Sequence, residues 1–197
     1  MRAILISDKP KWCALMMNGE KNIEVRKESV GKAVQKLIDE QGFADIYVYC
    51  TKEESLIYTD GTDGKGDYVD YKYYESYKGN KNDIGSGKVL FKFRCYKVDE
   101  FPYINDRYDE LIGSCLSEKE ILDYSTIKEE NGIRFVKTIY AIHISDLEIF
   151  DRPKELSEFK SYKKNIVNTN INGMVFETEL DNSLIKAPQN YCYVEVD

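Results

Sequence analysis

Histidine, tryptophan, proline and paired cysteines are scarce or missing in this sequence. Its 197 residues include one His, one Trp and four Pro, and the five cysteines stand far apart with no C-x-x-C pair (Cys13, Cys50, Cys95, Cys115 and Cys192). This spacing argues against a zinc site and indicates reduced, mostly buried thiols of a cytoplasmic protein. Long hydrophobic runs are missing as well. The start, MRAILIS, leads directly into Asp8 and Lys9, so we expect neither an export signal nor a membrane span.

An excess of positive charge is also absent. The net charge is −7, which argues against a protein that coats duplex DNA, because such proteins gain most of their affinity by neutralising phosphates. The charge is uneven, however. From Asp8 to Lys36 seven Lys or Arg stand against four Asp or Glu, a local net charge of +3 that leaves about −10 on the rest of the chain. This segment is compatible with a local anion-binding face on an acidic body.

Two motifs for bound ions or phosphates are incomplete. The stretch DGTDGKGD lacks the ligand spacing of a calcium loop, including its glycine and its final glutamate. GSGK lacks the earlier glycine of a P-loop and is followed by Val. We therefore expect no metal and no cofactor.

The first quarter of the chain predicts alternating strands and helices. Ala3 to Ile6 is a continuous apolar run, typical of a buried strand. Asp8 or Ser7 would cap a helix that has Pro10 in its first turn and ends at Asn18-Gly19. The pattern then predicts a strand over 22–27, an amphipathic helix over 29–41 that ends at Gly42, and a strand over 44–51.

The rest of the chain predicts further strands and two segments of different character. Residues 52–86 are poor in aliphatic residues and rich in Gly, Asp, Lys and Tyr, which indicates an insertion, part loop and part Tyr-rich hairpin, whose tyrosines would cover a site. Residues 161–186 are polar and irregular. The remaining expectations are single long strands over 88–98 and 138–150, a short helix opened by the capping box of Ser117 and Glu120, a short helical piece in DRPKELSEF, and a last strand in NYCYVEV.

These elements predict one domain over 1–197 of the α+β class. Hydrophobic residues make up 42% of the chain, enough to bury a core. Short helices packed on several non-adjacent strands favour a curled or closed sheet.

The run KPKW…NGEKNIEVRK, followed by a YVYCT strand, resembles the ASCH domain family, whose signature is G-x-K-x-x-E-x-R. Gly19, Lys21, Glu24 and Arg26 meet that signature in full. Three later stretches resemble a phage and bacterial subgroup of the family: GKVLFKFRCYKV, YAIHISDLEIFDRPKELSEF and APQNYCYVEV. The resemblance covers most of the chain except roughly residues 52–86 and 161–186. It implies the PUA-like fold, a small mixed β-barrel with a helix over a cleft.

What the resemblance implies for function is a cleft that binds RNA, a nucleotide or a modified nucleoside. One branch of the family, small amidohydrolases acting on acetylated cytidine, uses a Lys–Thr–Glu set in which Thr is the nucleophile. Glu24 stands where that branch has the Thr, counting from the shared Gly and Lys. A carboxylate does not do the chemistry of an activated hydroxyl, so this departure argues against that hydrolysis.

The signature residues themselves predict a polar site. Gly19 lets the chain turn from helix to strand and places Lys21 at the mouth of the strand, and strand alternation sends Glu24 and Arg26 to one side. Lys21 and Arg26 would hold a phosphate, and Glu24 would accept from a base or fix the Arg. The alternative is an exposed ladder of charges that keeps an edge strand soluble.

Several other residues are candidates for the same cleft, each with a structural alternative. Trp12, beside Lys11 on a helix, would stack on a base or simply pack. Tyr49 and Thr51 would line the cleft, or Tyr49 would be core. The single His143 lies in a strand and is more often structural than catalytic. Gln189 would read a base edge or belong to a turn. The candidate ligand-binding residues are Lys11, Trp12, Gly19, Lys21, Glu24, Arg26, Tyr49, Thr51, His143 and Gln189.

The sequence therefore favours a binding module for RNA, a nucleotide or a nucleoside. One alternative is an enzyme, a hydrolase on a modified nucleoside or a metal-assisted ribonuclease, with Glu24 as general base and Lys21 stabilising negative charge. Another is a phage-type protein that binds a host protein through residues 58–84, with the cleft vestigial.

Overall fold

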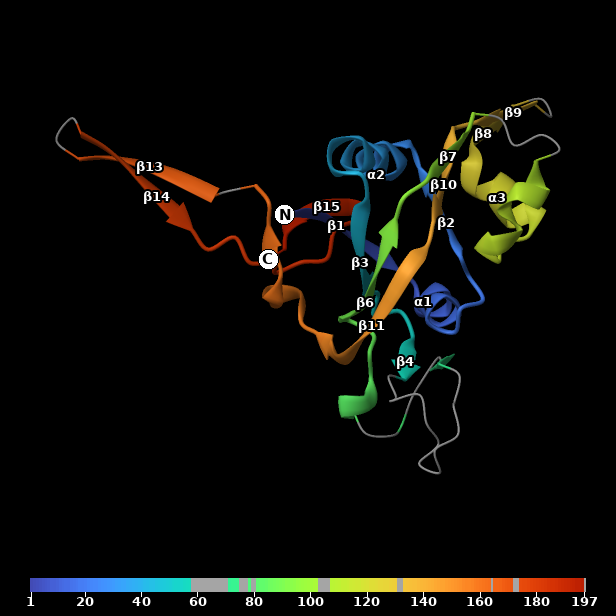
Figure 1. The fold of residues 1–197 in the computed structure, drawn as a ribbon, viewed down its shortest axis with the longest axis horizontal. Coiled ribbons are helices and arrows are strands. Elements are labelled where there is room, and N and C mark those ends of the chain that lie inside the picture. Colours follow the sequence, from blue (N-terminus) through green and yellow to red (C-terminus); the bar gives the residue numbers. More distant parts are fainter. Residues whose placement is uncertain are drawn as a thin grey trace.

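The computed structural model describes residues 1–57, 71–74, 78, 81–102, 107–130, 133–163, 165–171 and 174–196. At its centre lies a six-stranded sheet in which β1 and β3 are parallel and the other neighbours antiparallel (Figure 1). In spatial order the strands are β11 (Ser145–Lys154), β6 (Val89–Cys95), β3 (Ala44–Cys50), β1 (Arg2–Asp8), β15 (Tyr191–Glu195) and β12 (Lys160–Ser161).

A second, three-stranded antiparallel sheet and three antiparallel strand pairs complete the β structure. The second sheet has the order β2 (Ile23–Lys27), β10 (Ile139–His143), β7 (Val98–Phe101). The pairs are β4 (Ser55–Ile57) with β5 (Lys72–Tyr74), β8 (Thr126–Glu130) with β9 (Ile133–Val136), and β13 (Asn165–Ile171) with β14 (Met174–Leu180), the last projecting from the body (Figure 1).

The α+β class is confirmed, but the closed barrel is wrong. Among the described residues the large sheet ends at β11 and β12 and the small one at β2 and β7, and neither closes on itself. The two sheets are instead joined by chain segments that bend from one into the other.

Three α-helices have the ends that the sequence predicts. Pro10 begins α1, and Gly19 and Gly42 take the left-handed conformation (φ 75° and 85°) after α1 and α2. Ser117 and Glu120 form the capping box of α3. The helices are α1 (Pro10–Met17), α2 (Glu28–Gln41) and α3 (Glu118–Ser125), with 3-10 turns η1 (Lys81–Asp83), η2 (Tyr108–Ser114) and η3 (Leu156–Glu158).

The cap predicted for α1 is wrong. The N-cap residue is Lys9, with no side-chain cap, and the Asp8 carboxylate accepts from the Lys9 backbone N–H at 3.0 Å. Its other oxygen lies 3.2 Å from Arg26 Nη2. Asp8 therefore belongs to a polar cluster with Arg26 and is not the N-cap of α1.

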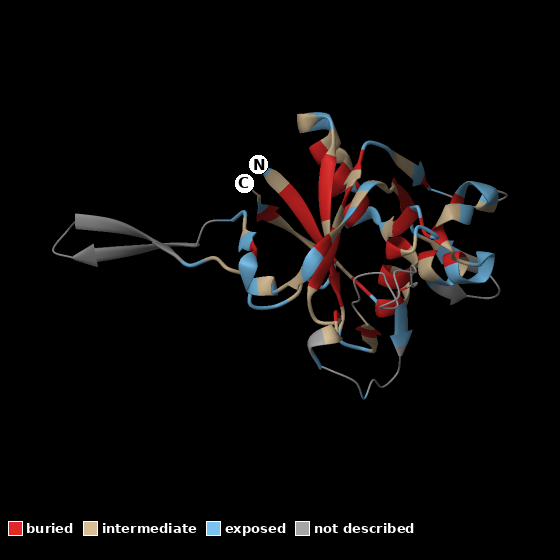
Figure 2. Cartoon of the chain, turned by 60° about the horizontal axis from the view of Figure 1, so that its bottom comes forward, coloured by how far each residue is buried: buried red, intermediate tan, exposed pale blue. Residues whose placement is uncertain are grey.

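Apolar side chains fill both faces of the large sheet, and Figure 2 colours much of this sheet as buried. On one face α1 and α2 bury Ile4 and Ile6, and on the other Leu5 packs with Tyr49. A third cluster lies between the small sheet and η2 and α3. Within the part of the chain that the structure describes, every helix is too short or too polar to cross a membrane.

Two strands predicted as continuous are each broken in two. The 88–98 pattern becomes β6 and β7, with a bend at Tyr96 and Lys97, and the 138–150 pattern becomes β10 and β11, with a break at Ile144. In both cases the two halves belong to different sheets. Because β6 pairs with β11 and β7 with β10, both segments cross between the sheets at the same place.

The two segments set apart by composition are more ordered than expected. Residues 165–180 contain the antiparallel pair β13–β14, so the prediction that residues 161–186 are irregular is wrong. In the insertion, β4 and β5 form an antiparallel pair, and Leu56 and Tyr71 are buried in the main core. Much of 58–84, the segment considered for a protein partner, lies outside the described residues, and that hypothesis stays a prediction.

Candidate functional site

A cavity of about 490 Å³ opens where the end of β1, the start of α1, β2 and α3 meet. Both signature charges of β2 face it, together with residues that follow β3 and precede β15. It is lined by Ser7, Asp8, Lys9, Trp12, Lys21, Glu24, Val25, Arg26, Thr51, Glu53, Leu116, Glu120, Asp123, Tyr124 and Gln189. We refer to this cavity as the pocket.

Backbone hydrogen bonds bring the signature residues into the pocket. After the turn at Gly19, the N–H groups of Glu20 and Lys21 both donate to Leu15 O, and Asn22 N–H donates to Gly113 O. The chain is therefore fixed to α1 on one side and to η2 on the other before β2 begins. Pairing of β2 with β10 then holds Glu24 and Arg26 on one face.

Lys21 is fully engaged inside the protein. Its side chain is 2% exposed, and Nζ donates to Ile23 O and to Ser114 O, both at 2.8 Å, while lying 3.2 Å from Glu24 Oε2. An ammonium has three N–H donors, so these three contacts satisfy it. Lys21 thus fixes η2 and Glu24 in place, and the expectation that it holds a ligand phosphate loses its geometric basis.

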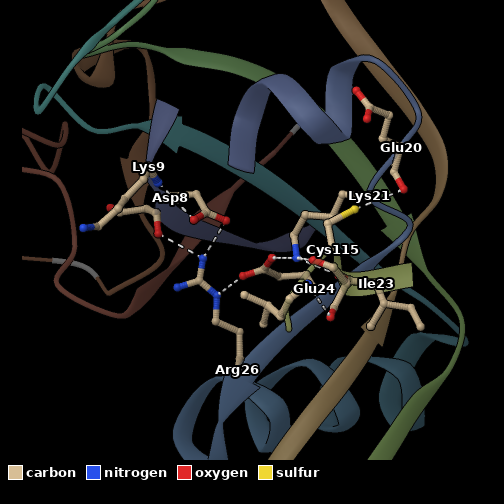
Figure 3. Close-up of polar contacts among 11 residues, drawn as sticks. Asp8, Lys9, Glu20, Lys21, Ile23, Glu24, Arg26 and Cys115 are labelled. Atoms are coloured by element: carbon tan, nitrogen blue, oxygen red, sulfur yellow. Dashed lines mark hydrogen bonds and ion pairs between the residues drawn. The ribbon is translucent and has the colours of Figure 1, made fainter. Parts of the chain in front are cut away.

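The other charges continue from Glu24 as a chain (Figure 3). Glu24 Oε1 lies 2.6 Å from Arg26 Nε, and Arg26 Nη2 donates to Ser7 O at 3.0 Å and to Asp8 Oδ2 at 3.2 Å. We call Lys21, Glu24, Arg26 and Asp8 the charged cluster. With Glu24 6% and Asp8 8% exposed, the cluster is not an exposed surface ladder. Arg26 Nη1 makes no hydrogen bond or ion pair with any described residue, which leaves two N–H donors for a ligand.

Burial changes the acid–base properties of the charged cluster. Desolvation, followed by the charge of Glu24, raises the pKa of Asp8 to about 7 in spite of Arg26 and Lys21. Desolvation also acts to raise the pKa of Glu24, but Arg26 and Lys21 together outweigh it and hold that pKa below its ordinary value. The two carboxyl groups therefore have different roles at neutral pH, since Glu24 is ionised and Asp8 exchanges a proton.

The outer edge of the pocket is acidic. We call Glu53, Glu120 and Asp123 the acidic rim; all three are exposed. Glu53 lies 3.1 Å from Lys9 Nζ, and Glu120 accepts from the Ser117 backbone N–H in the capping box. Ligands that enter the pocket pass this rim, which disfavours highly charged anions.

Aromatic and neutral polar groups complete the walls. The Trp12 ring has Lys21 Nζ at 5.3 Å and Lys11 Nζ at 4.4 Å from its centroid. Tyr124 lies on α3, and burial raises the pKa of its hydroxyl. Thr51 Oγ1 is buried without a hydrogen bond to the described residues, and Thr51 N–H donates to Asp8 O at 2.8 Å.

The structure brings together six of the ten candidate residues: Trp12, Lys21, Glu24, Arg26, Thr51 and Gln189 line the pocket. The other four do not. Lys11 lines a smaller hollow beside α1, Gly19 forms the preceding turn, and Tyr49 is buried on the opposite face of the large sheet. His143 pairs with Asp99 at 2.7 Å at the end of β10. Tyr71 and Tyr73 of the insertion line the hollow beside α1 and not the pocket.

Asp8 and the residues of α3 are among the pocket groups that the sequence interpretation missed. Asp8 was assigned to the helix cap, although its position directly after a buried strand also fits a pocket edge. Glu120, Asp123 and Tyr124 lie about a hundred positions from the signature, and no local pattern connects them. Among the described residues, no group of three or more His, Cys, Asp or Glu is arranged to hold a metal ion.

No protein-family model matches this chain, and no match is found among curated proteins. Among solved structures, the crystal structure of ASCH from Zymomonas mobilis is similar at 16% identity and a TM-score of 0.44, over 78% of this chain and 73% of that one. A point mutant of the same protein, ZmASCH, matches at 15% identity with the same TM-score, over 78% and 74%. At these values the likeness does not establish a shared site or activity.

Proposed function

We propose that this chain is a single ASCH-type, PUA-like domain that binds a nucleoside or nucleotide, free or as part of single-stranded RNA, in the pocket. The observation that supports this most is the convergence of Lys21, Glu24 and Arg26 at a cavity of about 490 Å³. Sites for small molecules and cofactors typically have volumes of about 300–1,000 Å³. The full match to the ASCH signature agrees with this proposal.

The chemistry of the walls suits a base. Arg26 Nη1 offers donors, and Gln189 offers a donor and an acceptor at the exposed side. The rings of Trp12 and Tyr124 provide surfaces against which a base packs. The acidic rim favours a ligand of low charge over a highly charged one.

An enzyme is the second candidate, and Asp8 is the observation that favours it. General acid–base groups work best when their pKa is near the working pH, and the pKa of Asp8 is about 7. Asp8 fits that role better than Glu24, whose carboxylate is held by Lys21 and Arg26. The substrate class would be a modified nucleoside or an RNA phosphodiester. Turnover of such a substrate by wild type, and its loss in Asp8→Asn, would distinguish an enzyme from a protein that only binds. Glu24→Gln is measured beside it to compare the roles of the two carboxyl groups.

Binding is tested with the single tryptophan as reporter, because Trp12 lies in the pocket wall. Fluorescence titration and calorimetry with nucleosides, nucleoside monophosphates and short single-stranded RNA should detect a ligand of wild type. Gln189→Ala and Arg26→Gln should weaken its binding at least tenfold.

The matched control is Arg94→Gln. Arg94 forms the same kind of Arg–Asp pair, with Nε 2.7 Å from Asp45 Oδ1, at the opposite end of β3. The Arg94→Gln variant should bind these ligands as tightly as wild type does. Equal binding by wild type, Gln189→Ala and Arg26→Gln, or no binding of any of these ligands by wild type, would contradict the proposal.

A further inference from the structure

The charged cluster has two charge states that differ by one proton. Lys21 and Arg26 carry two positive charges and Glu24 one negative charge, so the total depends on Asp8. With Asp8 ionised the cluster is neutral, and with Asp8 in its acid form the cluster carries one net positive charge. Because these groups are buried, one unit of charge has a larger effect on a ligand here than on the surface.

The geometry directs this charge towards the pocket. Lys21 Nζ is enclosed by Ile23 O, Ser114 O and Glu24, whereas Arg26 has donors left over on Nη1 (Figure 3). Asp8 contacts Arg26 through Nη2, the other terminal nitrogen of the same guanidinium. When Asp8 takes up a proton, Arg26 keeps Glu24 as its ion-pair partner but loses the second negative charge, the one beside Nη2.

We propose that Asp8 is a specificity-determining residue of the pocket, and that an anionic ligand group binds Arg26 together with a proton taken up by Asp8. A neutral nucleoside does not need that proton. This inference rests on the proposed function for the identity of the ligand. The raised pKa of Asp8, about 7, places the change within the ordinary pH range.

Other charged or titratable groups face Asp8 from every element around it. Burial raises the pKa values of the Cys13 thiol and the Tyr124 hydroxyl, so both stay uncharged near neutral pH. Burial acts to lower the pKa of Arg26, but the charges of Glu24 and Asp8 outweigh it and raise that pKa, so Arg26 stays charged. The acidic rim adds repulsion, which lowers anion affinity. Among the described residues, these groups are Lys9 beside Asp8, Cys13 on α1, Lys21, Glu24 and Arg26 around β2, Cys50 and Glu53 at and after the end of β3, and Glu120, Asp123 and Tyr124 on α3.

The test compares a nucleoside with a dinucleoside monophosphate of the same base, whose phosphodiester keeps one negative charge throughout. Titrations of wild type between about pH 6 and 8.5 should show diester affinity falling more than tenfold. The reason is that, above the pKa, each pH unit lowers the protonated fraction of Asp8 about tenfold. Nucleoside affinity should stay within twofold. In Asp8→Asn, diester affinity should remain at its low-pH level at every pH.

Asp123→Asn is the matched control, because it removes a carboxylate from the same pocket without touching Asp8. It should raise diester affinity uniformly and keep the wild-type slope. A diester affinity that is independent of pH in wild type, or an unchanged slope in Asp8→Asn, would overturn the proposal.

A ligand-free measurement keeps the inference testable if Asp8→Asn does not fold or if no nucleoside binds. Carbon-13 NMR of the Asp8 carboxyl in wild type should show a titration midpoint near 7, and added sulfate should raise it. A midpoint near 4, or no effect of sulfate on the midpoint, would contradict the Asp8 proposal. A midpoint near 7 that rises with sulfate, without binding of nucleosides or RNA, would retain the proton-coupled anion site and reject the proposed function.

Discussion

At the scale of single residues, Lys21 combines a charge with the contacts of a structural group. Its ammonium bridges Ile23 O on β2 and Ser114 O in η2 and balances Glu24. Removing one member of a buried ion pair leaves the other charge uncompensated, which typically costs more than the pair itself contributes. Lys21 is therefore required first for the shape of the pocket.

Lys21→Met should destabilise the protein by about 3–5 kcal/mol, because it leaves two buried carbonyls and part of Glu24 without a partner. Urea unfolding of wild type and variant measures this difference. The matched control is Lys119→Met, which removes an exposed lysine paired with Asp123 on α3; it should change stability by less than about 0.5 kcal/mol. Equal effects of the two substitutions would contradict a structural role for Lys21.

The sequence predicted part of the site because part of it is local. Gly19, Lys21, Glu24 and Arg26 lie within eight consecutive residues, so turn chemistry and strand alternation were enough to bring three charges together. Asp8 was missed because the residue before a helix more often caps it. For Tyr49 the core alternative is the correct one, because β3 is buried on both faces and Tyr49 packs with Leu5 on the face away from the pocket.

At the scale of elements, the sequence did not predict the breaks in two of the long strands. Apolar alternation continues through 88–98 and 138–150 without Gly or Pro, so no local signal marks the bends at Lys97 and Ile144. The bends are fixed by distant partners, since His143 N–H donates to Lys97 O and Ile144 N–H to Asn22 O. Such long-range pairing is not readable from one sequence window, whereas α2 with its stripe and final Gly42 is.

Helix α2 depends on a close approach to β10 at Gly31. A Cβ at this position would overlap the Tyr140 ring, so Gly31→Ala should destabilise the protein by about 1–3 kcal/mol despite the better helix propensity of Ala. Thermal and urea unfolding test this. Ser29→Ala, at an exposed position of the same helix, should be neutral or slightly stabilising. A Gly31→Ala protein as stable as wild type would show that Tyr140 can move aside freely.

Helix α3 holds one wall of the pocket through its capping box. Ser117→Ala removes the side-chain acceptor for Glu120 N–H and should cost about 1 kcal/mol. Hydrogen exchange should become faster in 118–125 while the large sheet is unchanged. Ser157→Ala, an exposed serine of η3, serves as control and should alter neither stability nor exchange. Unchanged protection of α3 in Ser117→Ala would contradict this assignment.

At the scale of the whole molecule, the pocket exists because three separately formed parts meet. The large sheet contributes Asp8 and Thr51, the small sheet contributes Glu24 and Arg26, and α3 closes the side with Tyr124. The hydrogen bonds of Lys21 to Ser114 O and of Arg26 to Ser7 O join these parts directly. The charged cluster therefore couples the packing of the sheets to its own ionisation, and the stability of the whole fold should depend on pH through it.

The two carboxyl groups of the charged cluster give this pH dependence opposite signs. Asp8 has a folded-state pKa of about 7 against an ordinary 3.8, so the folded protein holds a proton that the unfolded chain has lost, and this contribution to stability disappears as pH rises through 7. Glu24 has a lowered pKa, so its contribution is present above its ordinary 4.5 and is lost as pH falls. Stability should be greatest near pH 4 to 5, should decline as pH rises to about 7, by at most about 1.4 kcal/mol per pH unit from Asp8, and should level off above pH 7. Urea unfolding between pH 5 and 8 measures this decline, which Asp8→Asn should abolish and Asp39→Asn, at an exposed position of α2, should leave in place. If Asp8→Asn declines as steeply as wild type, the proton resides elsewhere and the charged cluster does not couple folding to pH.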